Sequence, residues 1–243
     1  MTEPRAESLI ITLDGPAGAG KSTVARTLAQ TLGWDFLDTG AMYRGVAAAA
    51  LDQNIDPADT DALAALAEQL HLSFNWSTDP PHLKVDSLDV THRLRDGDVT
   101  RAVSDVASNP AVRRVLVHAQ RWIAAEHPHL VTEGRDQGSV VFPNATVKFY
   151  VDASPQIRAK RRADQLREAG REVDEKKILS QIIYRDERDT TRSDGPLICP
   201  DDAIYIDTSA MSLEQVVQTL ADHARKAIAD RKAAGHAKVG ERP

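Results

Sequence analysis

The sequence has a single cysteine, Cys199, among 243 residues, so no disulfide can form within the chain. It lacks an apolar run of the roughly 18 residues that a membrane span requires, and the opening MTEPRAESL holds no apolar stretch of signal-peptide length. We therefore expect a soluble, cytoplasmic protein. We also expect Cys199 to be an inert packed thiol, because nothing near it in the sequence would activate it as a nucleophile.

An excess of positive charge is also missing. The 30 Lys and Arg residues against 36 Asp and Glu residues give a net charge of −6, which argues against a broad surface for nucleic acid or membranes. Any anionic ligand must therefore be met by local arginines. A chain of this length can bury one α/β core with an insertion but is short for several independent domains, and we expect a monomer.

The clearest motif that is present is GPAGAGKST, which fits G-x-x-x-x-G-K-[ST] and follows the apolar run 9–13. Its residues are Gly15, Pro16, Ala17, Gly18, Ala19, Gly20, Lys21, Ser22 and Thr23. The glycines let backbone N–H groups turn inward around a phosphate, and a helix that starts near Lys21 adds the positive end of its dipole. Lys21 would reach the β- and γ-phosphates, and Ser22 could bind Mg²⁺. The alternative is an ordinary glycine-rich turn before a helix.

Short apolar runs alternate with helical patterns along the chain, as a parallel sheet with crossover helices requires. We expect strands at residues 9–13, 35–37, 130–132, 146–151 and 203–206. Asn109 with Pro110 and Ser154 with Pro155 have the residue types of helix starts, and Ser212 with Gln215 forms a possible capping box. This pattern predicts an α/β fold with a five-stranded parallel sheet flanked by helices.

Two segments fall outside this alternation. Residues 70–100 read as an inserted hairpin with its turn at 78–81. The end of the chain, beyond the last predicted helix, reads as a frayed tail.

Three polar clusters could supply a binding site, although each has an ordinary reading. DTGAMYRG at 38–45 could be a helix cap with a surface arginine, and EGRDQGSVVFP at 133–143 could be a charged turn. In RDERDTTR at 185–192, Arg185, Asp189 and Arg192 share one face of a predicted helix and could form a solvated salt-bridge ladder.

Taken with the phosphate-binding motif, the same clusters predict a second anion site. Arginines that follow parallel strands can converge at one edge of the sheet, where their planar guanidinium groups clamp phosphate oxygens. The run IRAKRRADQLRE, with Arg158, Arg161 and Arg162, could be a mobile lid or a basic solvated helix face.

The chain resembles the bacterial cytidylate kinases, nucleoside monophosphate kinases that phosphorylate CMP and dCMP with ATP. The likeness spans about residues 9–230. It rests on GPAGAGKST, DTGAMYRG, VSDVASNPAVR, EGRDQGSVVFP, RAKRR, RDERDTTR and IDTS, in the family's order. The resemblance implies a P-loop kinase domain over residues 8–230 with an inserted monophosphate-binding region at about 66–106, a lid at about 155–172, and a disordered tail at 231–243.

The resemblance also implies roles for individual residues. Residues 15–23 would bind ATP with Mg²⁺, and the monophosphate would be held by Thr39, Arg44, Ser104, Arg113, Arg135, Asp136, Arg185, Asp189 and Arg192. Within that set, Arg44, Arg135 and Arg192 would hold the acceptor phosphate. Arg185 and Asp189 would meet the sugar, whereas Ser104, Arg113 and Asp136 would read the base. The catalytic residues would be Lys21, Arg135, Arg192, and Arg161 and Arg162 of the lid.

The implied reaction needs no general base, because the nucleophile is a phosphate oxygen whose second pKa is about 6. Two other interpretations remain open. A different P-loop kinase, acting on UMP, shikimate or a sugar acid, would share the loop but need other acceptor contacts. A GTPase-type switch would need an [NT]-K-x-D element, which does not occur in the sequence.

Overall fold

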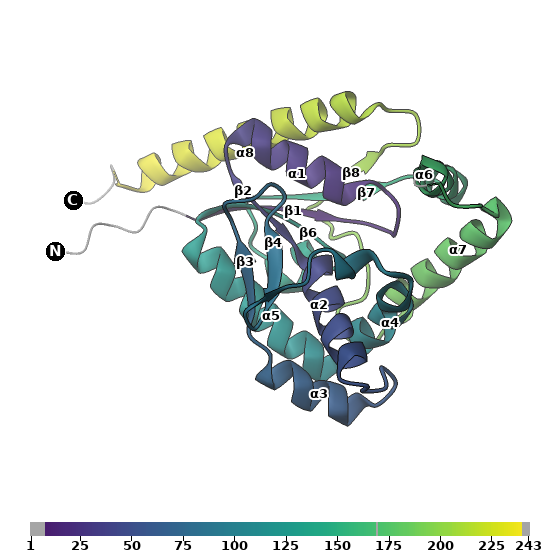
Figure 1. Cartoon of the computed structure of the whole chain (residues 1–243). Coiled ribbons are helices and arrows are strands. Elements are labelled where there is room, and N and C mark those ends of the chain that lie inside the picture. The colour runs from purple at the N-terminus through teal and green to yellow at the C-terminus, as the bar shows by residue number, and fades with distance from the viewer. Residues whose placement is uncertain (1–7, 169, 240–243) are drawn as a thin grey trace.

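A five-stranded parallel sheet lies at the centre of the computed structural model, which describes residues 8–168 and 170–239 (Figure 1). Its strand order is β2-β6-β1-β7-β8, and all four neighbouring pairs are parallel. The strands are β1 (Leu9–Asp14), β2 (Asp35–Asp38), β6 (His129–Glu133), β7 (Val147–Asp152) and β8 (Ile204–Asp207). Each lies within about one residue of a predicted strand, so the α/β prediction is confirmed.

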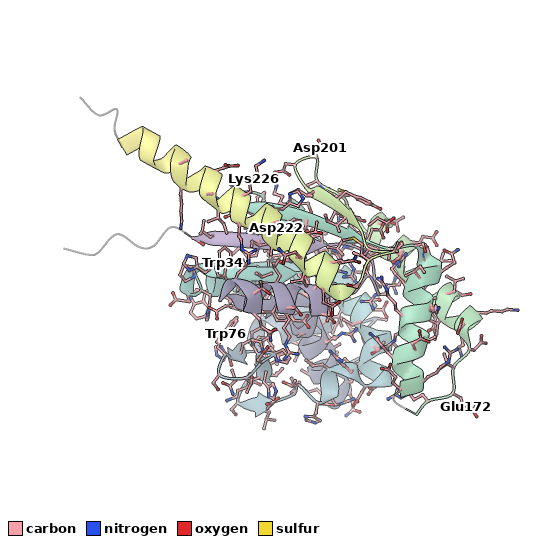
Figure 2. The ribbon with its side chains drawn as sticks, turned by 90° about the horizontal axis from the view of Figure 1, so that it is seen from above. Trp34, Trp76, Glu172, Asp201, Asp222 and Lys226 are labelled. Carbon is pink, nitrogen blue, oxygen red and sulfur yellow. The ribbon has the colours of Figure 1, made fainter. Side chains whose placement is uncertain are left out.

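Helices cover both faces of this sheet. They are α1 (Lys21–Leu32), α2 (Thr39–Asp52), α3 (Thr60–Gln69), α4 (Gly97–Ser108), α5 (Pro110–Glu126), α6 (Pro155–Glu168), α7 (Glu175–Thr191) and α8 (Leu213–Val239). In Figure 1, α1 and α8 lie on one side of the sheet and α2 and α5 lie on the other, whereas α6 and α7 stand beyond the carboxyl ends of the strands. Figure 2 shows α8 from above, with Glu172 at the far end of the α6–α7 pair.

Alternation along β1 explains how the sheet is buried on both faces. Ile11 and Leu13 pack with Leu28 of α1 and Leu220 of α8, and all four side chains are fully buried. Ile10 faces the opposite way and packs against the cluster that holds α2 and α5. Because both faces are covered, β1 is fixed in the middle of the molecule.

The inserted region differs in detail from the expected hairpin. It forms an antiparallel sheet of β3 (Leu72–Asn75), β4 (His82–Val85) and β5 (Leu88–Asp89), followed by the single turn η1 (Arg93–Arg95). Helix α4 begins at Gly97, inside the segment that was expected to end the hairpin. The turn between β3 and β4 contacts α1, because Nε of Arg26 donates to Oδ1 of Asp79 at 2.6 Å.

The predicted helix starts are confirmed at all three positions. The Ser154 hydroxyl accepts from the backbone N–H of Ile157 at 3.3 Å, and α6 begins at Pro155. The Asn109 side chain accepts from the backbone N–H of Ala111 at 2.9 Å, with Pro110 in the first helical position. Ser212 and Gln215 form the reciprocal bonds of a capping box, at 2.9 and 3.3 Å.

Two expectations near the end of the chain differ from the structure. Helix α8 continues through Val239, past the point where the tail was expected to begin, and residues 240–243 lie outside the described residues. Good helix formers such as Ala, Lys and Arg extend the helix there. Cys199 is exposed rather than packed. Among the described residues, no helix is long and apolar enough to cross a membrane.

Candidate active site

The phosphate-binding loop connects the end of β1 to the first turn of α1. Gly15 has a φ of +148°, and a side chain there would collide with the backbone carbonyl of Val151 on β7. Gly18 and Gly20 have φ values of +80° and +86°, in the left-handed region that glycine adopts at low cost. The loop therefore has the tight, inward-turning backbone that a phosphate cradle requires.

Lys21 lies over this loop as the first residue of α1. Its Nζ donates to the carbonyl oxygen of Pro16 at 2.8 Å, and the residue is 5% exposed. Burial lowers the pKa of Lys21 to about 7, and the positive charge of Arg135 acts in the same direction. A bound polyphosphate would supply the negative charge that restores the ordinary pKa of this lysine.

Oxygen atoms gather next to the loop. The Ser22 hydroxyl donates to Oε1 of Glu133 at 2.8 Å, and Glu133 is the register partner of Asp38 at the ends of β6 and β2. Burial raises the pKa of Asp38 to about 7, and the neighbouring Glu133 charge adds to the effect. A hydroxyl beside two carboxylates is the kind of donor set that Mg²⁺ prefers, so these residues fit the predicted ion.

Arginines from two elements form a second cluster beside the loop. Nε of Arg135, which follows β6, donates to Oδ2 of Asp189 on α7 at 2.8 Å, and Nε of Arg185 lies 4.0 Å from the same oxygen. Burial lowers the pKa of Arg185 to about 10, and Arg135 contributes in the same direction. Burial acts to raise the pKa of Asp189, but the two arginines more than offset it and hold the pKa below its usual value.

The next two predicted residues lie on α2. Nη1 of Arg44 donates to the carbonyl oxygen of Leu94 and to the hydroxyl of Thr100, both at 3.2 Å, and burial lowers the pKa of Arg44. The hydroxyl of Thr39 donates to the carbonyl oxygen of Glu133 at 2.7 Å. Arg44 thus links α2 to the inserted region, while Thr39 joins α2 to the end of β6.

Arg113 and Asp136 form a buried ion pair in which the two side chains are 1% and 4% exposed. Nη2 of Arg113 donates to Oδ2 of Asp136, and Nη1 donates to the hydroxyl of Tyr43 at 3.3 Å. Nε of Arg113 lies 3.2 Å from Oδ2 of Asp194. Burial acts to lower the pKa of Arg113, but Tyr43 and Asp136 more than offset it. The pair offers a guanidinium donor and a carboxylate acceptor side by side.

The predicted helical face of RDERDTTR is wrong at its last residue. Helix α7 ends at Thr191, and Arg192 has an extended ψ of 143°, so Arg192 does not share a helical face with Arg185. Its Nε donates to the carbonyl oxygen of Gly195 at 2.5 Å, which turns the chain away from the helix axis. Its Nη2 lies 3.9 Å from Oδ1 of Asp136. Arg192 therefore lies beside the Arg113–Asp136 pair.

Gly195 lies directly against the Arg113–Asp136 pair. Its φ is +57°, and a side chain built there would collide with the guanidinium of Arg113 and the carboxylate of Asp136. The loop that follows α7 is thus in direct contact with both residues.

The arginines of α6 differ in their contacts. Nη1 of Arg158 donates to the carbonyl oxygen of Ala17 in the phosphate-binding loop at 2.9 Å and lies 2.7 Å from Oδ2 of Asp186 on α7. Arg161 donates to the backbone carbonyl of Thr208 at 2.6 Å. Arg158 is 3% exposed, so the reading of this arginine as part of a solvated basic face is wrong.

Two predicted residues make few polar contacts. Arg162 is exposed, and partial desolvation together with the charges of Arg95 and Arg171 lowers its pKa. Ser104 is half-buried on α4, and its backbone carbonyl accepts from the hydroxyl of Ser108 at 2.8 Å. In the described part of the chain, no hydrogen bond joins Ser104 to Arg113 or Asp136.

Sequence reasoning did not single out several residues of this region. They are Asp14, Asp38, Tyr43, Glu133, Asp194 and Gly195. Asp38, Tyr43 and Glu133 lie inside the quoted motifs, at strand ends or one turn into a helix, so proximity to the predicted ligands could have identified them. Asp14 and Gly195 act through contacts with distant segments, which no local pattern reveals.

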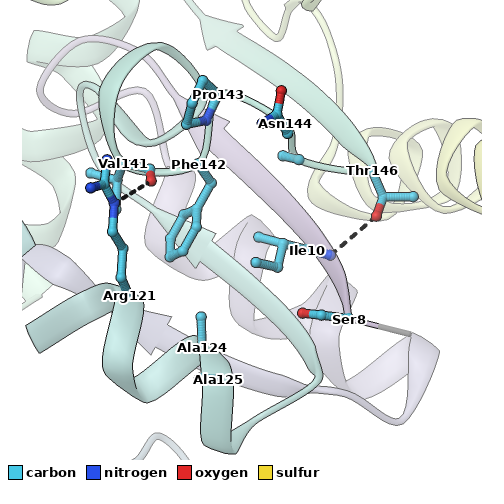
Figure 3. Close-up of a pocket in the computed structure, with 11 residues that line it drawn as sticks. Ser8, Ile10, Arg121, Ala124, Ala125, Val141, Phe142, Pro143, Asn144 and Thr146 are labelled. Atoms are coloured by element: carbon cyan, nitrogen blue, oxygen red, sulfur yellow. Dashed lines mark hydrogen bonds between the residues drawn. The ribbon is translucent and has the colours of Figure 1, made fainter. Parts of the chain in front are cut away.

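A separate hollow of about 440 Å³ lies at the other end of β1, between α5 and the segment that precedes β7 (Figure 3). Ile10 donates its N–H to the Thr146 hydroxyl at 3.2 Å, and Nε of Arg121 donates to the carbonyl oxygen of Val141 at 3.0 Å. Ile10, Val141 and Phe142 give it a largely apolar lining, in contrast to the arginine-rich region at the carboxyl ends of the strands.

Comparison with known proteins identifies similar chains. The family profile described as cytidylate kinase matches residues 11–226. The cytidylate kinase of Shigella sonnei (strain Ss046) is 41% identical over 220 residues, which cover 90% of this chain and 96% of the relative. The cytidylate kinase of Shewanella frigidimarina (strain NCIMB 400) is 42% identical over 223 residues, which cover 91% and 97%.

One solved structure among the similar folds is a gluconokinase from Sinorhizobium meliloti 1021. It has a TM-score of 0.47 and 14% sequence identity, and the match covers 98% of this chain and 100% of that one.

Proposed function

The chain belongs to the cytidylate kinase family, and we propose that it transfers the γ-phosphoryl group of ATP to CMP or dCMP at the carboxyl ends of its parallel strands. The products are ADP and CDP or dCDP. The family match and the curated relatives confirm the sequence expectation of an ATP-dependent nucleoside monophosphate kinase. The alternatives, a UMP, shikimate or sugar-acid kinase or a nucleotide switch, are not favoured.

One observation supports the assignment of this reaction to the site. Arg135 and Arg185 lie close enough to Lys21 for their charges to lower the pKa of the lysine. Gathering buried like charges is unfavourable, and anionic substrates reduce the repulsion when they bind. A reaction between two phosphorylated substrates brings such anions together, whereas a kinase for a neutral acceptor needs fewer positive groups.

On the donor side, we propose that residues 15–23 bind ATP, with the backbone N–H groups of the loop around the β-phosphate. Lys21 would move from its contact with Pro16 to the β- and γ-phosphates. Ser22 would hold Mg²⁺, with Glu133 and Asp38 beside it, and the ion would neutralise charge on the transferring phosphoryl group.

On the acceptor side, Arg44, Arg135 and Arg192 would hold the phosphate of CMP, while Arg185 and Asp189 would meet the sugar. Each arginine can offer two parallel N–H donors to a phosphate, which fixes orientation as well as position. Thr39 stays a predicted contributor on the same side, through the bond that joins it to the end of β6.

For the base, we propose that the Arg113–Asp136 pair reads cytosine, with Ser104 as a further predicted contact. Cytosine presents a donor at N4, where uracil presents an acceptor at O4. A carboxylate accepts from the first and repels the lone pairs of the second. The guanidinium of Arg113 suits the acceptors at N3 and O2 of cytosine.

Catalysis then consists of positioning and charge neutralisation. The attacking oxygen of CMP is ionised at neutral pH because its second pKa is about 6, so no side chain needs to remove a proton. Lys21 and the arginines would hold the attacking and leaving oxygens in line and stabilise the charge between them.

Water would be excluded by movement of two segments, the inserted region at about 66–106 and the lid at about 155–172. Arg161 and Arg162 of the lid would then approach the transferring phosphoryl group, and Arg161 would give up its contact with the loop after β8. We further propose that the enzyme works as a monomer in the cytoplasm, where ATP is available as donor.

Acceptor profiling tests this function. The purified full chain is given ATP and Mg²⁺ with CMP, dCMP, UMP, shikimate or gluconate, and ADP formation is followed. We expect CMP and dCMP to exceed UMP by at least about 10² in kcat/KM, because the wrong base leaves buried polar groups unpaired. Faster turnover of shikimate or gluconate than of CMP would contradict the assignment.

A further inference from the structure

Asp14, the last residue of β1, joins the phosphate-binding loop to the loop that carries Arg135 and Asp136. Its Oδ1 accepts the backbone N–H of Gln137 at 2.9 Å, and its Oδ2 accepts that of Gly138 at 2.7 Å. Asp14 is 2% exposed, so both bonds are shielded from water. The phosphate-binding loop begins at the next residue, Gly15.

The carboxylate is held in a rigid part of the molecule. Strand β1 is hydrogen-bonded on both sides, and the last pairings before the loop are Leu13 with Glu133 and Asp14 with Tyr150. Gly15 then passes directly against the backbone of Val151. Movement of Asp14 would require disruption of the sheet, so Asp14 is a fixed anchor for whatever bonds to it.

The two N–H groups need such an anchor. The carbonyl oxygen of Asp136 accepts from Val140 and Val141, at 2.9 and 3.1 Å, and opens the short helical turn η2 (Gln137–Val141). The N–H groups of Gln137 and Gly138 precede the first bonds of this turn and have no partner within it. The side chain of Asp136 makes no capping bond there, and Asp14 supplies the cap from another strand.

The charge of Asp14 depends on both loops. Burial raises the pKa of Asp14 to about 7, while the N–H groups of Gly138 and Gln137 and the charge of Lys21 act to lower it. The Asp14 carboxylate therefore interacts both with Lys21 and with the backbone of the loop that carries Arg135 and Asp136.

We propose that Asp14 is a positioning residue. It holds the loop that carries the proposed CMP-binding residues Arg135 and Asp136 against the rigid end of β1, where the ATP-binding loop begins. Asp14 touches neither substrate. It fixes the backbone one and two residues beyond Asp136, and so sets the direction in which Arg135 and Asp136 point. This inference rests on the proposed function, since it assigns a role to Asp14 in that same site.

The variant Asp14→Asn tests the proposal. It has nearly the same shape, but its amide N–H₂ would face one of the two backbone N–H groups, so one bond is lost and one buried donor is left unpaired. The side chain of Gln137 still bonds to Thr132 and Gln120, at 2.9 and 3.1 Å, which favours survival of the fold.

Thr12→Val is the matched control. Thr12 lies on the same strand two residues earlier and is fully buried, and its hydroxyl has no hydrogen-bond partner among the described residues. The Thr12 hydroxyl lies next to Gly138, so the substitution perturbs the same place while the bonds from Gln137 and Gly138 to Asp14 keep both partners.

For Asp14→Asn we expect the KM for CMP to rise at least about tenfold and the CMP to UMP ratio of kcat/KM to narrow, with the KM for ATP within about twofold of wild type. Thr12→Val should leave the KM for CMP, the KM for ATP and the CMP to UMP ratio of kcat/KM unchanged. Equal changes in the KM for CMP and for ATP, or a lower thermal midpoint with unchanged kinetics, would overturn the proposal. Failure of wild type to phosphorylate CMP would instead overturn the proposed function.

Hydrogen exchange gives a readout that does not depend on activity. In Asp14→Asn, the amides of Gln137 and Gly138 should exchange faster than in wild type, while the amides of β1 keep their protection. Unchanged exchange at both amides would also overturn the proposal. If Asp14→Asn does not fold, Asp14→Ser retains one small acceptor and is measured in the same way.

Discussion

Arg135 and Asp189, which are 54 residues apart in the sequence, are joined by a hydrogen bond of 2.8 Å between Nε and Oδ2. The bond connects the loop after β6 to α7, and Nη1 of Arg135 also donates to the carbonyl oxygen of Gly134 at 3.1 Å. The guanidinium is thus oriented before a substrate arrives. Such preorganisation reduces the side-chain entropy that is lost when a phosphate binds.

Removal of the loop lysine should abolish most phosphoryl transfer. In Lys21→Ala we expect kcat to fall by at least about 10², because Lys21 neutralises charge that develops on the β- and γ-phosphates. Steady-state kinetics with ATP and CMP measure the effect, and thermal unfolding checks that the fold survives. The control is Lys226→Ala, an exposed lysine on α8 that is outside the proposed binding residues (Figure 2). Near-normal kcat in Lys21→Ala would refute the assignment of the phosphate-binding loop.

The variant Arg192→Ala distinguishes a role of Arg192 in acceptor binding from a purely structural role. In Arg192→Ala we expect kcat/KM for CMP to fall by at least about 10², because one clamp on the acceptor phosphate is lost. The KM for ATP should change little. A solvated salt bridge would instead be worth at most about 1 kcal/mol of stability and would leave kinetics alone.

Arg225→Ala is the comparison for that variant. Arg225 pairs with Asp222 on the exposed side of α8 at 3.3 Å, and its side chain is 52% exposed. We expect Arg225→Ala to lose at most about 1 kcal/mol of stability and to keep its kinetics unchanged. If both arginine variants show unchanged CMP kinetics, Arg192 has no part in acceptor binding.

Gly195 should tolerate no side chain. In Gly195→Ala the methyl group would displace Arg113 and Asp136, so we expect the KM for CMP to rise at least about tenfold and the KM for ATP to stay constant. Gly33→Ala separates the clash from the backbone strain, because Gly33 has a φ of +67° and no neighbouring atom of the described residues lies within 4 Å of the added group. That control should cost about 1 to 2 kcal/mol of stability and leave kinetics unchanged. Equal kinetics for the two variants would argue against a role of the Gly195 contact in acceptor binding.

Local patterns in the sequence were enough to predict the five strands. Leu9 to Asp14 is apolar except at Thr12 and Asp14, and each later strand is a short run with apolar residues and with turn or cap residues beside it. The phosphate-binding loop was equally accessible, because its glycines and Lys21 occupy fixed spacings that reflect local backbone geometry.

Features that depend on distant contacts could not be predicted in this way. The end of α7 before Arg192 coincides with the bond from Arg192 to Gly195, and a helical pattern that continues through Arg192 gives no sign of it. Asp14 reads from the sequence as the polar end of a strand, since its partners Gln137 and Gly138 lie 123 and 124 residues away.

The central claim is that this site selects cytosine through the Arg113–Asp136 pair. Asp136→Asn keeps the size of the side chain but adds a donor, which can face O4 of uracil without repulsion. The variant should therefore lose activity on CMP while the penalty against UMP falls. It also weakens the ion pair with Arg113, so the two substrates must be compared on the same preparation.

The most direct measurement is the ratio of kcat/KM for CMP to that for UMP in wild type and in Asp136→Asn. We predict a wild-type ratio of at least about 10² that falls by at least about tenfold in the variant, because the carboxylate no longer rejects O4. A ratio that stays the same while both activities fall would contradict base recognition by Asp136 and leave it only a structural role in its loop.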